Sequence, residues 1–317
     1  MAGAGKRAIV TGSTGFVGAN LVRRLLRDGH EVHLLLRRGH APWRIAEILT
    51  DVHCHEVDLG DHADLERVVV AIKPDWVFHL AVHGAYSAQT DLQQMVQTNI
   101  VGTINLVEAA LRADVAAVIN TGSSSEYGFK DHAPTETAWL EPNSYYAVTK
   151  ASATLYCRHI AQRHGLLLPT LRLYSVYGPY EESSRLMPTL IAHGLRGELP
   201  PLVAPDVARD YVYIDDVTDA YILAATTSRQ EHGAVYNIGT GVQTPLHEVV
   251  DTVRRIMAID VAPVWGSMPN RGWDTSVWVA DNRAARRELG WQPAHTVETG
   301  LRRMVRWSEL HQGSHVA

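Results

Sequence analysis

A glycine-rich turn near the start of the chain constrains the fold more than any other feature. Glycines stand at positions 12, 15 and 18, after an apolar run over 8–10 and before an amphipathic stretch over 16–28. In such a strand–turn–helix unit the first glycine permits a tight turn, the second lets the backbone approach a pyrophosphate, and the third lets the helix pack closely on the strand. Unpaired N–H groups at the start of the helix attract the anion. This segment predicts a dinucleotide-binding unit at the beginning of an α/β fold.

Apolar and amphipathic segments alternate through the rest of the first half of the chain. The segment 76–80 is almost wholly apolar, which is typical of a strand that helices cover on both faces. A regular alternation of strands and helices predicts a Rossmann-type doubly wound parallel sheet. Further strands are expected over residues 32–36, 52–57, 115–120 and 169–173, and further helices over 62–72, 91–113 and 145–164.

The pattern changes after residue 173, where prolines become frequent and the expected elements become shorter. We expect residues 1–173 to form the dinucleotide-binding domain, together with a returning segment at 210–242 that contains a strand. Residues 174–209 and 243–317 are expected to form a smaller C-terminal domain that binds the substrate.

The composition excludes several classes of protein. An apolar fraction of 46% suffices for a full core, and 29 basic against 34 acidic side chains give a net charge of −5. That balance disfavours a nucleic-acid partner, and no apolar run approaches the roughly 18 residues of a membrane-spanning helix. Cys54 and Cys157 stand far apart, so no disulfide scaffold is expected. These features together predict a cytoplasmic protein that has neither a nucleic-acid nor a membrane partner.

Histidine is abundant, but its spacing indicates no metal site. The chain has 17 histidines and no His-Glu-x-x-His sequence. His159 and His164 stand five residues apart on an expected helix, so they do not share a face. We therefore expect no metal ion.

The end of the second strand indicates the choice of cofactor. An NAD-selective site carries an acidic residue about 20 positions beyond the glycines, where it holds the ribose 2′-hydroxyl. Here Leu36 fills that place, and Arg37 and Arg38 follow it. Guanidinium groups bind phosphate well, although a solvated basic turn is the simpler alternative. The segment predicts NADP(H) in preference to NAD(H).

Tyr146 and Lys150 carry the pattern of an acid–base pair. They stand four residues apart on the expected helix over 145–164, so their side chains share a face. A tyrosine has a pKa of about 10, and a neighbouring cation should lower it. Such a phenol can exchange a proton with a carbonyl or carbinol oxygen while a hydride moves at the carbon.

Three serines follow the strand over 115–120, at the sheet edge where open α/β folds bind ligands. A hydroxyl there can polarise a substrate oxygen, although a serine in such a place is often a turn or cap residue. The three candidates are Ser123, Ser124 and Ser125, and the pattern leaves open which of them acts.

From about residue 6 to about residue 307 the chain resembles the extended short-chain dehydrogenase/reductase family, in its nucleotide-sugar branch. The resemblance rests on motifs spread along the chain: TGSTGFVG at 11–18, Asp58-Leu59, His79-Leu80-Ala81, Asn99, GSSSEYG at 122–128, Tyr146-x-x-x-Lys150, RLYSVYGP at 172–179, RDYVYIDDV at 209–217, YNIG at 236–239 and LGWQP at 289–293.

The resemblance implies roles for residues in three groups. Tyr146 is implied as the acid–base residue, Lys150 as its partner, and Ser123 as the matching serine, with Ser124 kept as a candidate. Implied cofactor contacts are Gly12, Thr14, Gly15, Phe16, Val17, Gly18, Arg37, Arg38, Asp58, Leu59, Leu80, Ala81, Asn99, Thr121, Tyr146, Lys150, Tyr174 and Val176. Expected substrate contacts are His83, Tyr86 and Ser125, together with Arg209 and Arg271, which the resemblance places on a nucleotide-sugar pyrophosphate. A homodimer through the helices at 91–113 and 145–164 is also implied.

Differences from related enzymes narrow the expected reaction. The 4,6-dehydratases of this family carry an acid–base pair directly after the catalytic serine or threonine, where this chain has Ser124 and Ser125, and Glu126 stands one place later. Tyr145 occupies a place usually held by proline, but only Tyr146 has the required spacing to Lys150. The second strand is similar to that of NADP-using GDP-mannose dehydratases, and the serine loop looks like that of keto-sugar reductases.

We therefore expect a ketoreductase of deoxysugar biosynthesis. It would use NADPH to reduce a nucleoside-diphosphate 4-keto-6-deoxyhexose. The alternatives are a nucleotide-sugar 4-epimerase that retains its cofactor and a non-catalytic dinucleotide-binding regulator.

Overall fold

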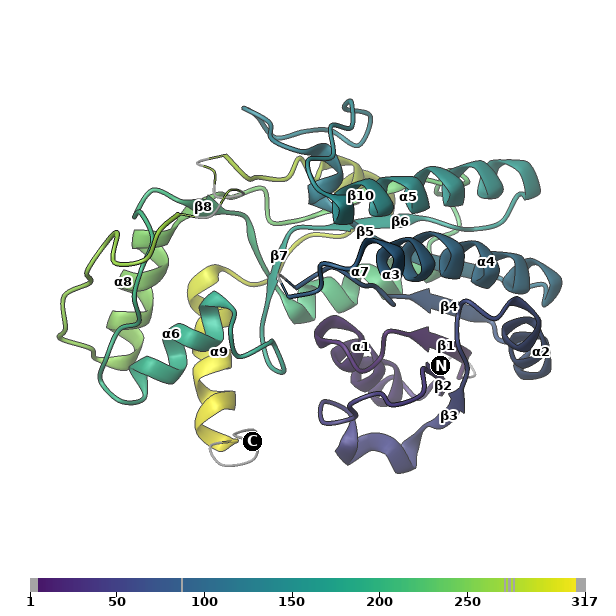
Figure 1. Ribbon diagram of the computed structural model, residues 1–317, viewed down its shortest axis with the longest axis horizontal. Helices are drawn as coiled ribbons and strands as arrows, with labels where there is room; N and C mark the ends of the chain where they lie inside the picture. The colour runs from purple at the N-terminus through teal and green to yellow at the C-terminus, as the bar shows by residue number, and fades with distance from the viewer. Residues whose placement is uncertain (1–4, 87, 271, 273–274, 276, 312–317) are drawn as a thin grey trace.

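The protein is described by a computed structural model covering residues 5–86, 88–270, 272, 275 and 277–311. A seven-stranded sheet lies between the helices of its N-terminal part (Figure 1). The strand order is β10-β6-β5-β4-β1-β2-β3, and every pairing in it is parallel. The predicted doubly wound parallel sheet is confirmed. Its strands are β1 (Arg7–Thr11), β2 (Glu31–Leu36), β3 (His53–Glu56), β4 (Trp76–His79), β5 (Ala117–Ser123), β6 (Thr170–Leu173) and β10 (Val235–Ile238).

Helices cover both faces of this sheet because side chains alternate along each strand. Ile9 of β1 packs with the core formed by α2, α4 and α5, whereas Ala8 and Val10 pack with the core on the opposite face, which includes α1 and α7. Both faces of the central strands are therefore apolar, as the sequence of residues 76–80 suggested. The flanking helices are α1 (Phe16–Arg27), α2 (His62–Ile72), α3 (Leu92–Val96), α4 (Gly102–Arg112), α5 (Tyr145–His164) and α7 (Ile214–Thr226).

The order of connection reverses between β1 and β4, because the chain builds outward through β2 and β3 before it crosses to the other side of β1. Ligands of open α/β sheets bind at the carboxyl ends of the strands at such a point. The glycine turn, the residues after β4 and the serines at the end of β5 all lie at this edge. The sheet thus brings together three segments that are far apart in the sequence.

A second group of shorter elements lies beside the sheet and contains most of the C-terminal part of the chain (Figure 1). It includes two small sheets, β7 with β9 and β8 with β11. Its elements are β7 (Ser175–Tyr177), α6 (Leu186–Gly194), β8 (Ala208–Arg209), β9 (Tyr211–Tyr213), β11 (Thr244–Pro245), α8 (Leu246–Met257) and α9 (Val297–Leu310). Short 3-10 helices at Ala46–Asp51 and Ser124–Tyr127, and wider π-helical turns at Gln97–Val101 and Ala285–Leu289, complete the helical segments.

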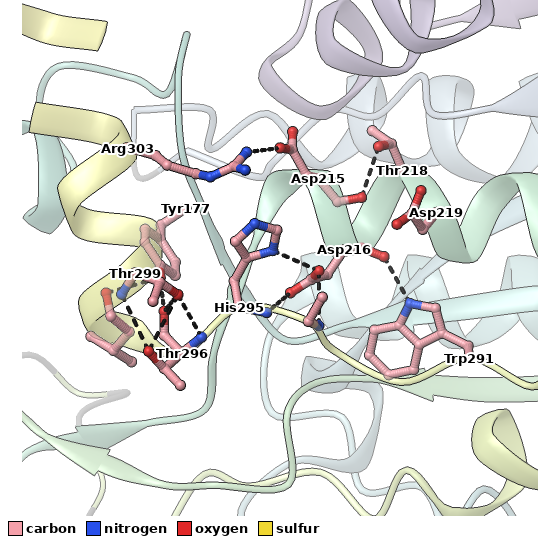
Figure 2. Close-up of polar contacts among 12 residues, drawn as sticks. Tyr177, Asp215, Asp216, Thr218, Asp219, Trp291, His295, Thr296, Thr299 and Arg303 are labelled. Carbon is pink, nitrogen blue, oxygen red and sulfur yellow. Dashed lines mark hydrogen bonds and ion pairs between the residues drawn. The ribbon is translucent and has the colours of Figure 1, made fainter. Parts of the chain in front are cut away.

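Asp216 joins the two parts of the molecule through hydrogen bonds shown in Figure 2. Its buried carboxylate accepts hydrogen bonds from the backbone N–H groups of Ala294 and His295, both at 3.1 Å, and from His295 Nδ1 at 2.8 Å. Trp291 donates from Nε1 to the carbonyl oxygen of Asp216 at 2.8 Å. The motifs at 209–217 and 289–293 therefore meet, and these contacts attach the segment before α9 to the first turn of α7.

The expected helix over 91–113 is divided into α3 and α4 by the π-helical turn Gln97–Val101. Such widened turns are frequent at functional sites, because they change the direction in which one side chain points. Within the described ranges, no helix is both long enough and apolar enough to cross a membrane.

Candidate active site

The turn between β1 and α1 has the geometry that the glycine spacing predicts. Gly12 has a φ of +68°, and a Cβ on Gly18 would lie only 2.2 Å from the carbonyl oxygen of Gly12. A side chain is therefore excluded at both positions. Gly15 is the N-cap of α1, so no side chain of the capping residue competes for the first N–H groups of the helix.

Space and unpaired polar groups at this turn fit a dinucleotide phosphate. A Cβ on Gly15 would meet one atom within 4 Å, the carbonyl oxygen of Gly12 at 3.2 Å, so this side of the turn is open. The buried hydroxyl of Ser13 has no hydrogen-bond partner in the part of the chain that is described. Thr14, Phe16 and Val17 are half-buried around the same turn.

A buried chain of hydrogen bonds fixes the end of β4 beside this turn. Thr11 Oγ1 is 2.8 Å from His79 Nδ1, and His79 Nε2 is 2.9 Å from the hydroxyl of Thr103. Burial lowers the pKa of His79 to about 3, so this imidazole is neutral. Thr11 Oγ1 also accepts from the N–H groups of Leu80 and Ala81 at 3.2 and 3.1 Å. The two residues expected to line the cofactor therefore lie against the glycine turn.

Asn99 lies in the π-helical turn and holds the loop after β4. Its side-chain oxygen accepts from the N–H of His83 at 2.8 Å, and its amide nitrogen donates to the His83 carbonyl and to Thr149 Oγ1, both at 2.9 Å. Asn99 thus links the loop to α5, the helix of Tyr146 and Lys150. Its observed contacts are with protein groups, so it positions the loop that carries His83.

The basic residues at the end of β2 are exposed. Arg38 Nε donates to Glu56 Oε1 at 3.1 Å, and the side chain of Arg38 is 91% exposed. Arg37 is also exposed. Asp58 and Leu59 follow the neighbouring strand β3. Asp58 Oδ1 accepts a hydrogen bond from the N–H of Gly60 at 2.8 Å, and the Leu59 carbonyl accepts one from Asn105 at 2.8 Å.

A third arginine near the glycine turn escaped the sequence analysis. Arg44 is buried, and it donates to the Tyr180 carbonyl at 2.8 Å, to Glu182 at 2.9 Å and to the Thr14 carbonyl at 3.4 Å. It therefore ties the glycine turn to the loop that follows β7. No sequence spacing could have identified it, because its partners stand 30 to 138 positions away.

Tyr146 lies beside Ser123, whereas its neighbour Tyr145 points to solvent. The Tyr145 side chain is 64% exposed. Tyr146 is half-buried, and the Ser123 side chain lies close enough to its phenol to oppose the rise in its pKa. Lys150 is buried one turn later on α5. This arrangement agrees with Tyr146, rather than Tyr145, as the acid–base candidate.

The acidity of Tyr146 differs from the expectation. Burial raises the pKa of Tyr146 and outweighs the opposite effect of the nearby Ser123 side chain. Burial also lowers the pKa of Lys150, although the nearby Glu126 carboxylate opposes this. We predicted that Lys150 lowers the pKa of Tyr146. For the protein without cofactor or substrate this prediction is wrong, because desolvation disfavours the tyrosinate.

The serine loop is a capped turn in which the three hydroxyls have different surroundings. Ser123 caps the turn Ser124–Tyr127 and accepts from the N–H of Ser125 at 3.2 Å. Ser123 is the serine that acts on the pKa of Tyr146, whereas Ser124 lies in a hollow toward the C-terminal elements. That hollow is lined by Ser124, Tyr127, Gly128, Lys130, His132, Pro134, Tyr174, Val277, Trp278 and Val279.

Glu126 is bound into the core beneath this loop. Its carboxylate accepts from Arg172 Nε at 2.8 Å, from the N–H of Ser123 at 2.8 Å and from Thr154 Oγ1 at 3.1 Å. The Glu126 side chain is 0% exposed and that of Arg172 is 3% exposed. Glu126 is thus held in the core by three protein groups beneath the serine loop.

The remaining predicted residues are distributed around these groups. Thr121 Oγ1 is 2.6 Å from the Tyr221 hydroxyl, and the N–H of Val176 donates to the Tyr174 carbonyl at 2.9 Å. The buried Tyr174 hydroxyl has no hydrogen-bond partner among the described residues. Arg209 donates to the Ala208 carbonyl at 2.7 Å, and its guanidinium lies 5.6 Å from the centre of the Trp278 ring, beside the hollow. Arg271 lies outside the described residues.

Glu181 is a further candidate that the sequence analysis missed. It follows the Tyr-Gly-Pro turn after β7, and its side chain is 7% exposed, 3.9 Å from Arg185. Burial raises the pKa of Glu181 to about 8, and its Oε2 has no hydrogen-bond partner in the described part of the chain. Arg185 and Glu181 both act electrostatically on Tyr86, so this carboxyl lies near an expected substrate contact. The only sequence feature that could have identified Glu181 is its position two residues after the RLYSVYGP motif at 172–179.

A glycine turn at the switch point of a parallel sheet, facing a tyrosine and a lysine on a neighbouring helix, defines an oxidoreductase site of the Rossmann class. Comparison with known proteins agrees. A model of the NAD dependent epimerase/dehydratase family matches residues 8–239. The chain belongs to this family and is an enzyme of the extended short-chain dehydrogenase/reductase type.

Individual relatives match over nearly the whole chain. UDP-glucose 4-epimerase from Mycolicibacterium smegmatis is 32% identical over 309 residues, covering 94% of this chain and 97% of that protein. dTDP-glucose 4,6-dehydratase from Neisseria meningitidis serogroup B is 30% identical over 337 residues, covering 95% and 93%. The crystal structure of Thermus thermophilus UDP-glucose 4-epimerase in complex with NAD matches with a TM-score of 0.83 and 28% identity, covering 96% of this chain and 99% of that one.

Proposed function

We propose that this enzyme catalyses 4-epimerisation of a nucleoside-diphosphate hexose, with Tyr146 as the acid–base residue. The observation that carries the proposal is the arrangement of Tyr146, Ser123 and Lys150 at the carboxyl ends of the strands, with Glu126 bound to Arg172 and unable to act as a dehydratase base. The similarity to UDP-glucose 4-epimerases supports the choice of reaction.

The nicotinamide cofactor would be held by the glycine turn, the ends of β2 and β4, and α5. When bound, it would accept a hydride from the sugar carbon and return it. Ser123 would hydrogen-bond the sugar oxygen, while Tyr146 removes the proton from that oxygen and later gives it back. The buried Lys150 would support the tyrosinate when the cofactor and substrate have excluded water. The cofactor contacts named from the resemblance remain proposals.

Reduction of a nucleoside-diphosphate 4-keto-6-deoxyhexose by NADPH is the second candidate. The observation that favours it is the exposed pair Arg37 and Arg38 at the end of β2, which suits a ribose 2′-phosphate. Cells keep NADP mainly reduced, so an enzyme with this cofactor would act in the direction of reduction. The same Tyr146 would then protonate the new alkoxide.

One experiment separates the two reactions. The purified enzyme is supplied with UDP-glucose or dTDP-glucose and, separately, with a 4-keto-6-deoxy sugar plus NADPH. Epimerisation predicts a C4 epimer with no net change in nicotinamide absorbance, whereas reduction predicts one NADPH consumed per sugar. Tyr146→Phe should abolish either activity, and the absence of both activities in the native enzyme would overturn the proposal.

We also propose a homodimer and a division into two domains. Tyr145, Val148 and Leu155 on α5 are 64%, 46% and 58% exposed, and so much apolar surface on one helix is typical of an interface. Light scattering on the native enzyme and on the Val148→Asp/Leu155→Asp variant tests this, with a monomer expected only for the variant. Two further points stay predictions. One is the division into two domains, with limits at 1–173 with 210–242 and at 174–209 with 243–317. The other is a cytoplasmic location.

A further inference from the structure

A cluster of histidines lies at the end of the sheet opposite to the active site. Glu31 and His33 stand two residues apart on β2, and His53 is paired with His33 on the neighbouring strand β3. All three side chains lie on the same face, because alternate residues of a strand share a face and paired residues of neighbouring strands do too. His55 lies on that face as well and helps to line a hollow beneath α2.

The distances within the cluster are close to those of a metal site. Glu31 Oε1 lies 2.9 Å from His33 Nε2 and 4.0 Å from His53 Nε2. The candidate ligand atoms of the three residues all lie within 4.8 Å of one another. Ligands of tetrahedral zinc, with bonds of about 2.0–2.2 Å, lie about 3.4 Å apart. A rotation of His53, whose side chain is 62% exposed, would close the remaining gap.

A fourth side chain is placed to orient one of these ligands. His33 Nδ1 is 2.9 Å from His55 Nε2. If His33 carries its proton on Nδ1 and donates it to His55, the lone pair of Nε2 points toward Glu31 and His53. Metal-binding histidines usually make such an outer hydrogen bond. His55 is thus a positioning residue.

Two arginines border the hollow, but both are engaged. Arg7 Nε lies 3.2 Å from Glu31 Oε1 and its Nη1 donates to the Ile72 carbonyl at 2.8 Å, while Arg67 is bonded to Asp64 at 2.5 Å. An incoming metal ion must therefore share the Glu31 carboxylate with Arg7. Because both arginines are engaged, an anion is not the expected ligand of this hollow. The nitrogens of neutral histidines bind metal ions and do not attract anions, so a metal ion is the ligand that suits them best.

The geometry points to a binding site for a divalent transition-metal ion such as Zn²⁺, held by Glu31, His33 and His53 with water in the fourth position. Two imidazoles and one carboxylate form a ligand set that zinc commonly takes. The site lies at the amino ends of β2 and β3, about 16 Å of strand away from the cofactor end of β2. It would therefore join the edge strand β3 to the sheet and take no part in the hydride chemistry. The helical spacing examined in the sequence could not reveal ligands on two neighbouring strands.

The test uses the full-length enzyme, freed of metal, in competition with a chromogenic chelator for Zn²⁺. We expect one zinc ion per chain, and an affinity at least about tenfold lower in His53→Ala and in Glu31→Gln. Both side chains are exposed enough for the variants to fold, which thermal unfolding verifies. His132→Ala is the matched control, because its side chain is 64% exposed and lies far from the cluster in sequence.

Added zinc should also raise the Tm of the native enzyme, and that of His132→Ala, by mass action, and leave that of His53→Ala unchanged. His55→Ala should weaken zinc binding about tenfold, and His55→Gln, which keeps a hydrogen-bond acceptor, should restore it. The proposal is overturned if the native enzyme does not compete for zinc or if His53→Ala binds it as tightly as the native enzyme.

Discussion

The carboxylate of Glu126 and the guanidinium of Arg172 form an ion pair of 2.8 Å that is almost completely removed from water. The pair lies directly beneath the loop that presents Ser123 to Tyr146, and Glu126 also accepts the N–H of Ser123 at 2.8 Å. The position of the catalytic serine candidate therefore depends on a buried charge. The Glu126 carboxylate is thereby fully engaged by protein groups.

Loss of that charge should destabilise the protein. Glu126→Gln leaves Arg172 buried without a counter-charge, so the free energy of unfolding should fall by about 3–5 kcal/mol, measured by urea denaturation. Glu198→Gln is the control, because Glu198 forms an exposed pair with Arg196; its effect should stay below about 0.5 kcal/mol. Equal effects for the two variants would contradict the structural role of Glu126.

Tyr146→Phe removes the proton donor with little change in volume. We expect kcat to fall by about 10²–10⁴-fold while cofactor binding survives, as measured by steady-state kinetics and cofactor titration. Tyr145→Phe should have little effect, because Tyr145 faces solvent. Ser123→Ala should reduce kcat more than Ser124→Ala or Ser125→Ala. The reverse ranking of the two tyrosines would show that the wrong one has been assigned.

The exposed arginines at the end of β2 should determine the choice of cofactor. Under the second candidate reaction, the NADPH-dependent reduction, NADPH should bind more tightly than NADH to the native enzyme, because guanidinium groups pair with the 2′-phosphate. Arg37→Asp/Arg38→Ser should reverse that order in fluorescence titrations, and Arg67→Ser, an exposed substitution on α2, should not. Native enzyme that binds NADH at least as well as NADPH would contradict the interpretation of Leu36-Arg37-Arg38.

A nucleoside diphosphate should stabilise the folded enzyme by mass action. Thermal unfolding with UDP, GDP, CDP, ADP and dTDP identifies the base that binds best. Arg209→Ala and Arg271→Ala should each reduce the rise in Tm, because both arginines are proposed to hold the diphosphate. If none of the five diphosphates raises the Tm, the nucleotide-sugar assignment is wrong.

Glu181 should make stability depend on pH. Burial raises its pKa from 4.5 to about 8 in the folded chain, so between these values the folded state binds a proton that the unfolded state has lost. The contribution of Glu181 to the free energy of unfolding therefore decreases as the pH rises from about 4.5 to 8. Glu181→Gln, which is neutral at every pH, should lose less stability over this window in urea denaturation. Parallel pH profiles for both proteins would show that Glu181 is ionised in the folded state.

The sequence alone was sufficient for features that depend on neighbouring residues. The order of strands and helices followed from local periodicity, and the glycine turn followed from the backbone angles that Gly12 requires. The four-residue spacing of Tyr146 and Lys150 was enough to place both on one face of α5, because helix geometry is the same in any fold. The predicted parallel sheet is confirmed by the structure, and the predicted family by the comparison with known proteins.

Contacts between distant residues were decided only by tertiary structure. Ser123, rather than Ser124 or Ser125, meets Tyr146 because the end of β5 packs against α5. Glu126 is a structural residue because Arg172, 46 positions away, neutralises it, and the pKa of Tyr146 rises because burial outweighs its local partners. The cluster of Glu31, His33 and His53 exists because β2 and β3 pair in one particular register. A linear pattern contains none of these distances, since register and burial arise only when the elements pack together.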